Sequence, residues 1–567
     1  MTEGGERGGP AAPSPEARPR RRLLLITSLV IALVYVVATG PHLIPTGDQA
    51  TFVLLGKSLA TGQGYRDIGR AVHIPHTKFP PGLPLMLAPV SKLPHRSTED
   101  FLPEKLLVAI LGLLAALAVL PVLRRTGATP GEAALVALLT ALNARQFFLS
   151  HTIMSEAPFL LATLLFVLAV ERWRRDGRVF SSGLVFSLVA VFLALSLRTA
   201  GVALVLAGGL FLVLGRREPR QREAEAPSRS PGGDDPPARV RFLQATCLGV
   251  FSLLLLLGWS WRNLRAGGES LDYLAQLFSR GEESMLAEED GVNSLGEGLV
   301  TRALSGSVFY AREARNLLFL EEELVTELGR MLPATTALSW IFVLLLSAAL
   351  LELGMDLVRR RSLASLITVV TLGMLVLWPW RSFRLLAPVL PFLLLFLVRA
   401  VSRLSLLAPR GASWRLRHLP AAVILGSVLA VNVAAIAVLV TQGNRSAFGG
   451  QNLFSAPGDA TFYRKDYRDY LDLARETGQS LLPSEARVLC SKPELFHLFS
   501  GLPCVAFLPT SEAEALLDQI ERHGITHVVL DPLKPNPLKE WLREDRHTEP
   551  RLVEAARRGR CVLYQLW

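Results

Sequence analysis

Ionisable side chains recur at the ends of apolar runs in this chain, where a hydrophobic segment would meet water. Asp48 follows the first long apolar run, Leu23 to Leu43. A carboxylate at the mouth of a membrane helix is well placed to act as a general base, whereas the alternative for a lone aspartate is a solvated loop acid. The predicted topology brings five more charged residues to the side of Asp48: Lys78, Glu156, Arg198, Arg381 and Arg384.

The arginines of this group are candidates for binding a phosphate. Arg381 and Arg384 share the segment 378–384 with two tryptophans, and Arg198 ends another apolar run. A guanidinium group binds phosphate in a bidentate manner, and its cost near hydrocarbon makes such an arginine a functional candidate. The alternative for each arginine is snorkelling to lipid headgroups, with the tryptophans in an interfacial belt. Three arginines on the side of Asp48 favour phosphate binding.

Three further residues are weaker candidates. Lys78 precedes Phe79-Pro80-Pro81-Gly82. The prolines restrict the backbone and Gly82 permits a tight turn, so a rigid loop could hold the ammonium against an anion. Glu156 begins an apolar run, where a carboxylate either caps a helix or binds a sugar hydroxyl. His151 is a possible partner in acceptor or sugar binding, or a satisfied polar residue. The sequence has no Cys/His cluster with ligand spacing, so no zinc site is indicated. We predict no metal and no cofactor.

The elements that must position these residues are membrane helices. Half of the residues are hydrophobic, and several runs approach the roughly 20 apolar residues that cross a bilayer. We therefore predict a mainly α protein, a polytopic transmembrane helical bundle. The sequence indicates about eleven spans: 23–43, 104–123, 131–150, 157–171, 180–197, 200–215, 243–261, 334–353, 362–379, 383–400 and 419–441.

The distribution of charge predicts the orientation. The net charge of +11 comes largely from arginine clusters between apolar runs, which is the positive-inside pattern and not a nucleic-acid-binding surface. A cytoplasmic N-terminus places an arginine-rich loop after every second span, and an odd number of spans leaves the C-terminus outside. We expect a multi-pass protein of the bacterial inner (plasma) membrane, with the lipid bilayer and no nucleic acid among its partners.

Composition also divides the chain into segments. Residues 1–22 are rich in Gly, Pro and Arg and are expected to be disordered, and the apolar run after them is interpreted as a retained helix and not a signal peptide. The membrane domain is expected to cover 23–441. Its long connections are two external loops at 44–103 and 262–333 and a cytoplasmic linker at 216–241.

The tail, 442–567, has a different rhythm. Short apolar runs alternate with helical patterns there, which predicts a small extracytoplasmic α/β domain. Three of the four cysteines lie in it: Cys490, Cys504 and Cys561. A Cys490–Cys504 disulfide and buried free thiols are both compatible with an oxidising compartment.

In chain order, these residues form a series of short motifs that resembles a known family. The motifs are Gly47-Asp48-Gln49, Gly62-x-Gly64-Tyr65, Lys78-x-Pro80-Pro81-Gly82, Ser155-Glu156-x-Pro158, Leu197-Arg198-Thr199, Trp261-Arg262-Asn263 and Arg384-x-x-x-Pro388-x-x-Pro391. The series resembles the GT-C superfamily of polyprenyl-phosphate-sugar-dependent glycosyltransferases. Within it, the chain is most similar to the family 39 type, which includes protein O-mannosyltransferases and the aminoarabinose transferase of lipid A.

The resemblance implies a reaction and roles. It implies inverting transfer of a hexosyl or pentosyl group from a polyprenyl-phosphate-linked donor to an acceptor hydroxyl on the outer face. Asp48 matches the catalytic acid of the first loop, and Lys78 matches the lysine that approaches the donor phosphate. Arg384, with Arg381 and Arg198, would neutralise the leaving phosphate, and Glu156 matches the acid of the second external loop. Many members have Asp-Glu where this chain has Asp48-Gln49, which puts divalent-metal binding there in doubt.

Two other classes of function stay open. A transporter or flippase of a lipid-linked or anionic solute would also combine charges with many spans, often with inverted repeats. The sequence shows no internal repeat, and the candidate charges gather at one external mouth. A non-catalytic membrane scaffold with an external binding domain is the third class. The sugar and the acceptor, whether lipid, glycan or protein, are not specified.

Overall fold

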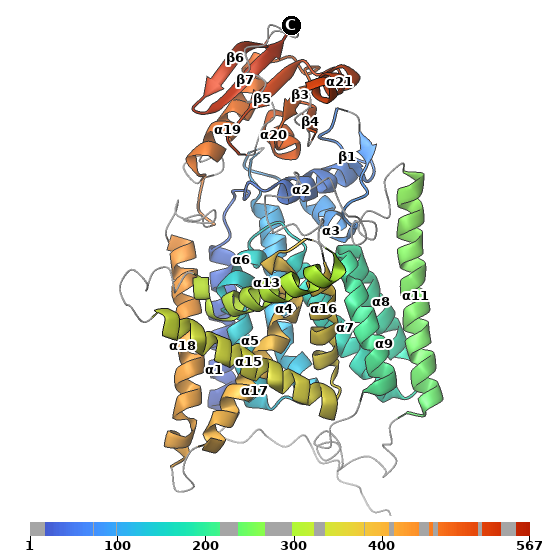
Figure 1. Ribbon diagram of the computed structural model, residues 1–567, viewed down its shortest axis with the longest axis vertical. Coiled ribbons are helices and arrows are strands. Elements are labelled where there is room, and N and C mark those ends of the chain that lie inside the picture. The colour runs from blue at the N-terminus through green and yellow to red at the C-terminus, as the bar shows by residue number, and fades with distance from the viewer. Residues whose placement is uncertain are drawn as a thin grey trace, which may run out of the picture.

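The computed structural model combines a helical bundle with a small sheet domain at one end (Figure 1). It describes residues 17–71, 73–97, 99–215, 236–266, 298–322, 335–378, 380–407, 413–441, 453–456, 463–508, 513–533 and 552–567. The predicted fold class, a mainly α bundle with a C-terminal α/β domain, is confirmed. Most of the expected linker at 216–241, and much of the expected loop at 262–333, lie outside the described residues.

Each of the eleven predicted apolar runs falls on a helix or a broken pair of helices. These are α1 (Ala17–Val37), α4 (Leu102–Arg125), α5 (Pro130–Ala141) with α6 (Ala144–Ser150), α7 (Glu156–Asp176), α8 (Ser182–Leu197), η1 (Thr199–Gly201) with α9 (Val202–Leu214), α11 (Ala238–Arg265), α15 (Thr335–Arg359), α16 (Leu363–Leu377), η3 (Phe383–Val389) with α17 (Leu390–Arg403), and α18 (Trp414–Thr441). Helix α1 begins inside the range 1–22 that was expected to be disordered, because arginine and alanine propagate a helix well.

The lengths of these helices set a lower bound on the spans. Among the described residues, five helices are long and apolar enough to cross a membrane, or six if the α5–α6 pair, bent by 60°, is one span. Four shorter apolar helices accompany them. The total of eleven spans therefore stays a prediction.

Helix α17 is the centre of the bundle and α11 lies at its edge. The most apolar stretch of the η3–α17 segment is 78% buried, against 17% for that of α11, which lies at the right edge of the bundle in Figure 1. Fully buried leucines and phenylalanines along α17 pack against α5, α15 and α18. The residues that precede α17 are thereby fixed against the core, and Arg384 is one of them.

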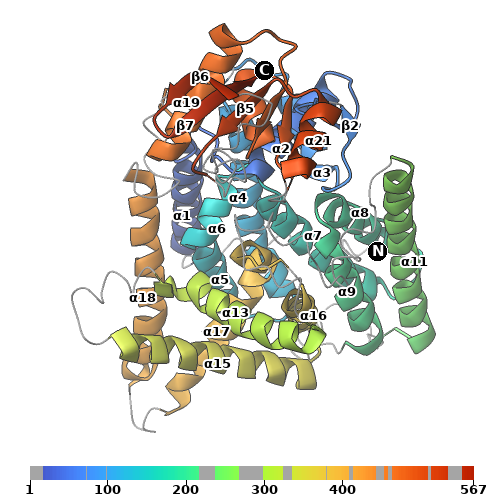
Figure 2. The ribbon, with the colours of Figure 1, turned by 45° about the horizontal axis from the view of Figure 1, so that its top comes forward.

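The segment 44–103 was expected to be a loop, and the structure folds it. It contains α2 (Gly47–Ala60), the short antiparallel strands β1 (Arg66–Asp67) and β2 (Ile74–Pro75), and α3 (Gly82–Val90). The apolar run of α2 is too short to cross a bilayer, and it is buried between the bundle and the sheet domain (Figure 2). In the second long loop, the described residues 298–322 contain α13 (Leu299–Phe319), which lies across the bundle (Figure 1).

The C-terminal domain is a five-stranded sheet flanked by helices. The strands are β3 (Val488–Cys490), β4 (Cys504–Ala506), β5 (His527–Leu530), β6 (Leu552–Arg558) and β7 (Cys561–Leu566), in the order β4-β3-β5-β7-β6. Strand β3 is parallel to β4 and β5, whereas β7 is antiparallel to β5 and β6. The helices are α19 (Lys465–Glu476), α20 (Pro493–Ser500) and α21 (Ala513–His523). The three cysteines of the domain are buried and are not joined in a disulfide within the described residues.

Candidate active site

The first-loop aspartate and the arginine–tryptophan corner meet in the folded chain. Asp48 lies in the first turn of α2, and Arg384 lies in η3, 336 residues later. Arg384 Nη1 is 3.4 Å from Asp48 Oδ2, and Lys78 Nζ is 3.8 Å from Asp48 Oδ1. Both oxygens of the carboxylate therefore face a cation. The Asp48 side chain is 27% exposed and that of Lys78 65%, so the pair is open to solvent.

A second, buried carboxylate lies on the other side of Arg384. Glu156 is the first residue of α7 and is only 1% exposed. Its Oε1 is 2.6 Å from Arg198 Nη1 and 4.0 Å from Arg384 Nε. Arg198 occupies the break between α8 and η1, in an extended conformation that interrupts the two helices. Arg384 thus lies between Asp48 and Glu156, and Glu156 lies between Arg198 and Arg384.

Glu156 also faces a cavity. Its second oxygen, Oε2, is buried and has no hydrogen-bond partner among the residues that the structure describes. A small cavity of about 20 Å³ lies beside it, and Glu156, Arg198 and Arg384 form the charged part of its wall. The remaining wall is mostly apolar: Phe159, Ala200, Leu204, Thr371, Met374, Leu375, Leu385 and Pro388. The cavity therefore joins a charged mouth to a hydrophobic interior. We call Asp48, Lys78, Glu156, Arg198 and Arg384 the mouth cluster.

The loop that carries Lys78 is held by side chains on both sides. His76 Nδ1 lies 2.7 Å from Asp67 Oδ1, and His76 Nε2 accepts a hydrogen bond of 2.9 Å from the Phe79 backbone N–H. Since Nε2 is the acceptor, the ring proton of neutral His76 is on Nδ1 and is donated to Asp67. Tyr65 Oη donates to the Phe79 carbonyl at 2.9 Å. These bonds fix the backbone next to Lys78.

The end of α11 completes this support. Arg262 Nη1 donates to the His76 carbonyl and Nη2 to the Tyr65 carbonyl at 3.3 Å, while Asn263 Nδ2 donates to the Thr77 carbonyl at 3.0 Å. The motifs around Tyr65 and around Arg262 therefore serve one purpose, which is to place the lysine loop. Sequence reasoning gave these residues no role, because a contact between segments 186 residues apart leaves no local pattern.

Gly82 lies where the lysine loop touches α8. A β-carbon on Gly82 would come within 2.6 Å of the Ser196 carbonyl oxygen, so any larger residue would push α3 away from α8. The sequence suggested that this glycine permits a tight turn. The structure gives it a different role, since it is the first residue of α3 and allows a close helix contact two residues before Arg198.

Two candidates have contacts outside the mouth cluster. Arg381 is buried, and its Nη2 lies 2.5 Å from Ser305 Oγ on α13. His151 is buried against Tyr35 and Phe147, and its ring nitrogens lie 2.7 and 2.9 Å from the carbonyl oxygens of Phe147 and Tyr35. These contacts involve no member of the mouth cluster, so functional roles for Arg381 and His151 stay predictions.

Gln49, the residue after Asp48, makes a structural contact. It is buried, and its Oε1 accepts a hydrogen bond of 3.0 Å from the Ile153 backbone N–H. This bond ties the start of α2 to the segment before α7, which carries Glu156. The side chain of Gln49 therefore helps to set the distance between the two acids of the mouth cluster.

Comparison with known proteins gives a match in structure. No family model matches the sequence, and no curated protein does. The crystal structure of ArnT from Cupriavidus metallidurans bound to undecaprenyl phosphate aligns over 97% of this chain and 98% of its own, with a TM-score of 0.53 and 13% identity. The Archaeoglobus fulgidus oligosaccharyltransferase AglB, in complex with an inhibitory peptide and a dolichol-phosphate, aligns over 90% of this chain and 69% of its own, with a TM-score of 0.54 and 13% identity. At this identity the likeness establishes the fold alone: the chain has the overall fold of ArnT and AglB.

Proposed function

We propose that this protein is a membrane glycosyltransferase that moves a sugar from a polyprenyl-phosphate-linked donor to an acceptor hydroxyl on the extracytoplasmic face. The observation that carries the proposal is the mouth cluster: Arg384 joins Asp48 to Glu156 at the polar end of a cavity with a mostly apolar wall. A lipid phosphate has the same division into an anionic head and an apolar chain. The ligands in the ArnT and AglB structures, undecaprenyl phosphate and a dolichol-phosphate, belong to this chemical class.

The charges of the cluster suit such a donor. Three cations, Lys78, Arg198 and Arg384, face two carboxylates, which leaves a single positive charge. A sugar joined to a lipid through one phosphate carries a single negative charge. A donor phosphate that enters between Lys78 and Arg384 would draw both cations from Asp48 and release the carboxylate for catalysis.

The proposed reaction gives each of these groups a role. Asp48 accepts the proton of the acceptor hydroxyl while the acceptor oxygen forms a bond to the anomeric carbon. The bond from that carbon to the phosphate oxygen breaks, and its electron pair leaves with polyprenyl phosphate. The leaving phosphate gains one negative charge, and Arg384, Lys78 and Arg198 stabilise it where it develops. Attack from the face opposite the leaving group inverts the anomeric configuration.

Glu156 is suited to a different task in this reaction. Its free oxygen lies beside the proposed phosphate site, where a hydroxyl or an amino group of the donor sugar would reach it. A buried carboxylate oxygen without a partner is costly, and a donor group from the substrate would satisfy it. We propose that Glu156 orients the sugar and that no metal takes part.

The test compares envelope molecules in cells with and without the protein. Lipids, glycans and proteins of the envelope are analysed by mass spectrometry for a sugar that disappears on deletion. Asp48→Asn should reproduce the deletion, whereas Asp100→Asn, an aspartate of the same loop that binds Arg96 and the Leu102 backbone, should retain the sugar. Full glycosylation by Asp48→Asn would reject the proposed reaction. Unchanged glycosylation with altered sidedness of a lipid-linked solute would favour a transporter or flippase.

A further inference from the structure

A buried lysine of the C-terminal domain reaches the segment that leads to Asp48. Lys492 follows β3 and directly precedes α20, and it is 3% exposed. Its Nζ lies 2.7 Å from Tyr467 Oη and 3.5 Å from the Pro45 carbonyl oxygen. Pro45 stands immediately before Thr46, the residue at the N-terminal cap of α2, and three residues before Asp48. The ammonium group therefore touches the chain at the point where it enters the catalytic helix.

A second buried lysine holds the same segment from the membrane side. Lys105, on α4, is 1% exposed, and its Nζ donates a hydrogen bond of 2.8 Å to the His42 carbonyl. The Phe101 backbone N–H donates to the Pro41 carbonyl at 3.0 Å. Three carbonyls between Pro41 and Pro45 are thus engaged by donors, two from the bundle and one from the C-terminal domain. The segment that leads into α2 is therefore held between the helical bundle and the C-terminal domain.

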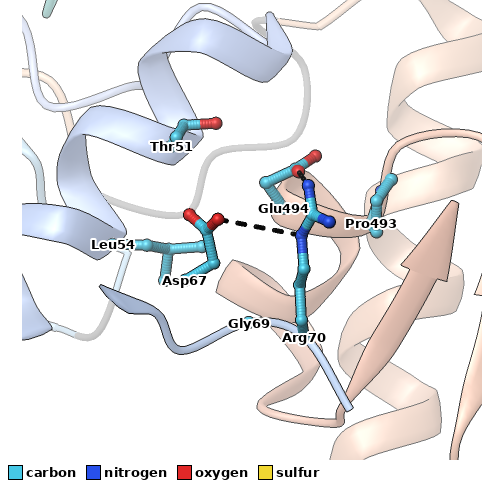
Figure 3. Close-up of a pocket in the computed structure, with 7 residues that line it drawn as sticks. All are labelled: Thr51, Leu54, Asp67, Gly69, Arg70, Pro493 and Glu494. Carbon is cyan, nitrogen blue, oxygen red and sulfur yellow. Dashed lines mark ion pairs between the residues drawn. The ribbon is translucent and has the colours of Figure 1, made fainter. Parts of the chain in front are cut away.

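The C-terminal domain makes several polar contacts with the first loop, 44–103, so it can hold α2 in place. Arg475 forms two contacts with Glu99, at 2.5 and 2.6 Å, and the Cys504 N–H donates to the Gly69 carbonyl at 3.0 Å. Beside α2, Arg70 lies between Asp67, at 3.9 Å, and Glu494, at 4.0 Å, in a small pocket formed by the first loop and α20 (Figure 3).

The burial and position of Lys492 favour a role in positioning α2 over a role in attaching the C-terminal domain to the bundle. Burial of an ammonium group is unfavourable unless hydrogen bonds satisfy it, and apolar contacts would attach the domain at lower cost. Lys492 follows the carboxyl end of β3, and ligand and catalytic groups gather at this edge of parallel sheets. We infer that Lys492 is a positioning residue that fixes the first turn of α2 and hence Asp48. The inference rests on the proposed function, because it assigns Lys492 to the placement of the proposed general base.

The experiment uses the purified full chain and three variants. Lys492→Met removes the ammonium and keeps the apolar stem. Arg487→Gln is the matched control, because Arg487 lies at the other end of β3, where its Nη1 donates to the His523 carbonyl at 2.7 Å within the domain. Asp48→Asn reports on the proposed function. For each variant we measure amide hydrogen exchange over residues 46–55 and 486–496, binding of undecaprenyl phosphate, and the sugar transferred in cells.

The expected result is selective. Lys492→Met should speed exchange at 46–55 by about tenfold or more, which corresponds to about 1.4 kcal/mol, and lower transfer by at least tenfold. Its affinity for undecaprenyl phosphate should stay within about twofold of the wild type, because Lys78, Arg198 and Arg384 are intact. Arg487→Gln should raise exchange in 486–496 and leave 46–55 and transfer near the wild type.

Two results would overturn the inference. One is unchanged exchange at 46–55 in Lys492→Met, and the other is equal loss of transfer in Lys492→Met and Arg487→Gln, which would make Lys492 a stabilising residue only. Failure of the proposed function appears elsewhere, as full transfer by Asp48→Asn. That outcome leaves the exchange result to decide whether Lys492 holds α2.

Discussion

Charged clusters of similar composition lie at the two ends of α17, and they differ in how fully their polar atoms are paired. At the end near the C-terminal domain, Arg384 precedes the helix and contacts Asp48 and Glu156. At the opposite end, which 14 residues place about 20 Å away, Arg399 and Arg403 contact acids of α5 and α15. We call this set, Glu132, Glu352, Asp356, Arg399 and Arg403, the far cluster.

Each charged side chain of the far cluster lies close to an opposite charge of the same cluster. Arg399 lies 3.8 Å from Glu132 and 3.5 Å from Asp356, Arg403 lies 2.5 Å from Glu352, and the Ser362 hydroxyl donates to Asp356. These pairs join three helices. The mouth cluster differs, because one oxygen of Glu156 has no hydrogen-bond partner within the described part of the chain, and a cavity adjoins it. Charges that satisfy one another hold helices together, whereas charges that leave a buried atom unpaired beside a space indicate a ligand.

The largest contrast is expected between aspartates of the two clusters. Asp48→Asn should lower sugar transfer by about 10²- to 10⁴-fold, the usual contribution of a general base, with an unchanged melting temperature. Asp356→Asn should retain transfer and lower the free energy of unfolding by about 3 kcal/mol, because Arg399 and Arg360 lose a buried anion. Transfer assays and thermal melts of both variants check the comparison, and a reversal of the two phenotypes would refute it.

An arginine exchange probes lipid-phosphate binding at each end. Arg384→Met should weaken the affinity for undecaprenyl phosphate by about 10- to 100-fold, because charge-assisted bonds to the phosphate are lost. Arg384→Lys should recover part of the affinity, since lysine keeps the charge without the bidentate fork. Arg399→Met serves as the control and should bind the lipid like the wild type. Equal binding by Arg384→Met and the wild type, measured by titration in detergent, would place the phosphate elsewhere.

A change at Glu156, whose Oε2 is unpaired within the described ranges, should act in opposite directions on lipid binding and on sugar transfer. Glu156→Gln keeps the shape and removes a negative charge, so undecaprenyl phosphate should bind more tightly. Transfer should fall roughly tenfold, because the proposed contact to the sugar is weakened. Binding and transfer are measured on the same preparation. Parallel losses of both would mean that Glu156 only stabilises Arg198.

Acidic pH should slightly lower the stability of the C-terminal domain. Burial lowers the pKa of His497, on α20, below the usual value of about 6.5. The folded state therefore resists protonation, and His497 contributes stability above that value that is lost as the pH falls through it. His497→Gln should reduce the loss of melting temperature on acidification, by less than the effect of Asp356→Asn. Identical acid profiles of the variant and the wild type would exclude this contribution.

The positions of the helices could be predicted because membrane segments have few alternatives. A long apolar run in a bilayer must satisfy its backbone as a helix, so the runs near 104–123 and 419–441 mark α4 and α18. The same topology placed Asp48 and Arg384 on one side, which is why their contact was foreseeable. Helix α2 was missed because its apolar run is short, and its burial depends on the C-terminal domain.

Contacts between distant segments left no signal in the sequence. The polar strand β6 has no apolar alternation, and it forms because β7 offers an edge. Lys492 and Lys105 look like surface lysines until the fold buries them against carbonyls. The bond between Arg198 and Glu156 joins residues 42 apart, so sequence reasoning named both residues without pairing them. Local propensity determines elements, and tertiary packing determines which side chains meet.

A cryo-electron microscopy structure of the full chain with undecaprenyl phosphate tests the central claim most directly. We expect density for the phosphate between Lys78, Arg198 and Arg384, with Asp48 released from at least one of its two cations and the lipid chain along Leu204, Met374 and Leu375. A phosphate bound at the far cluster, or a lipid chain that avoids the cavity beside Glu156, would contradict the account.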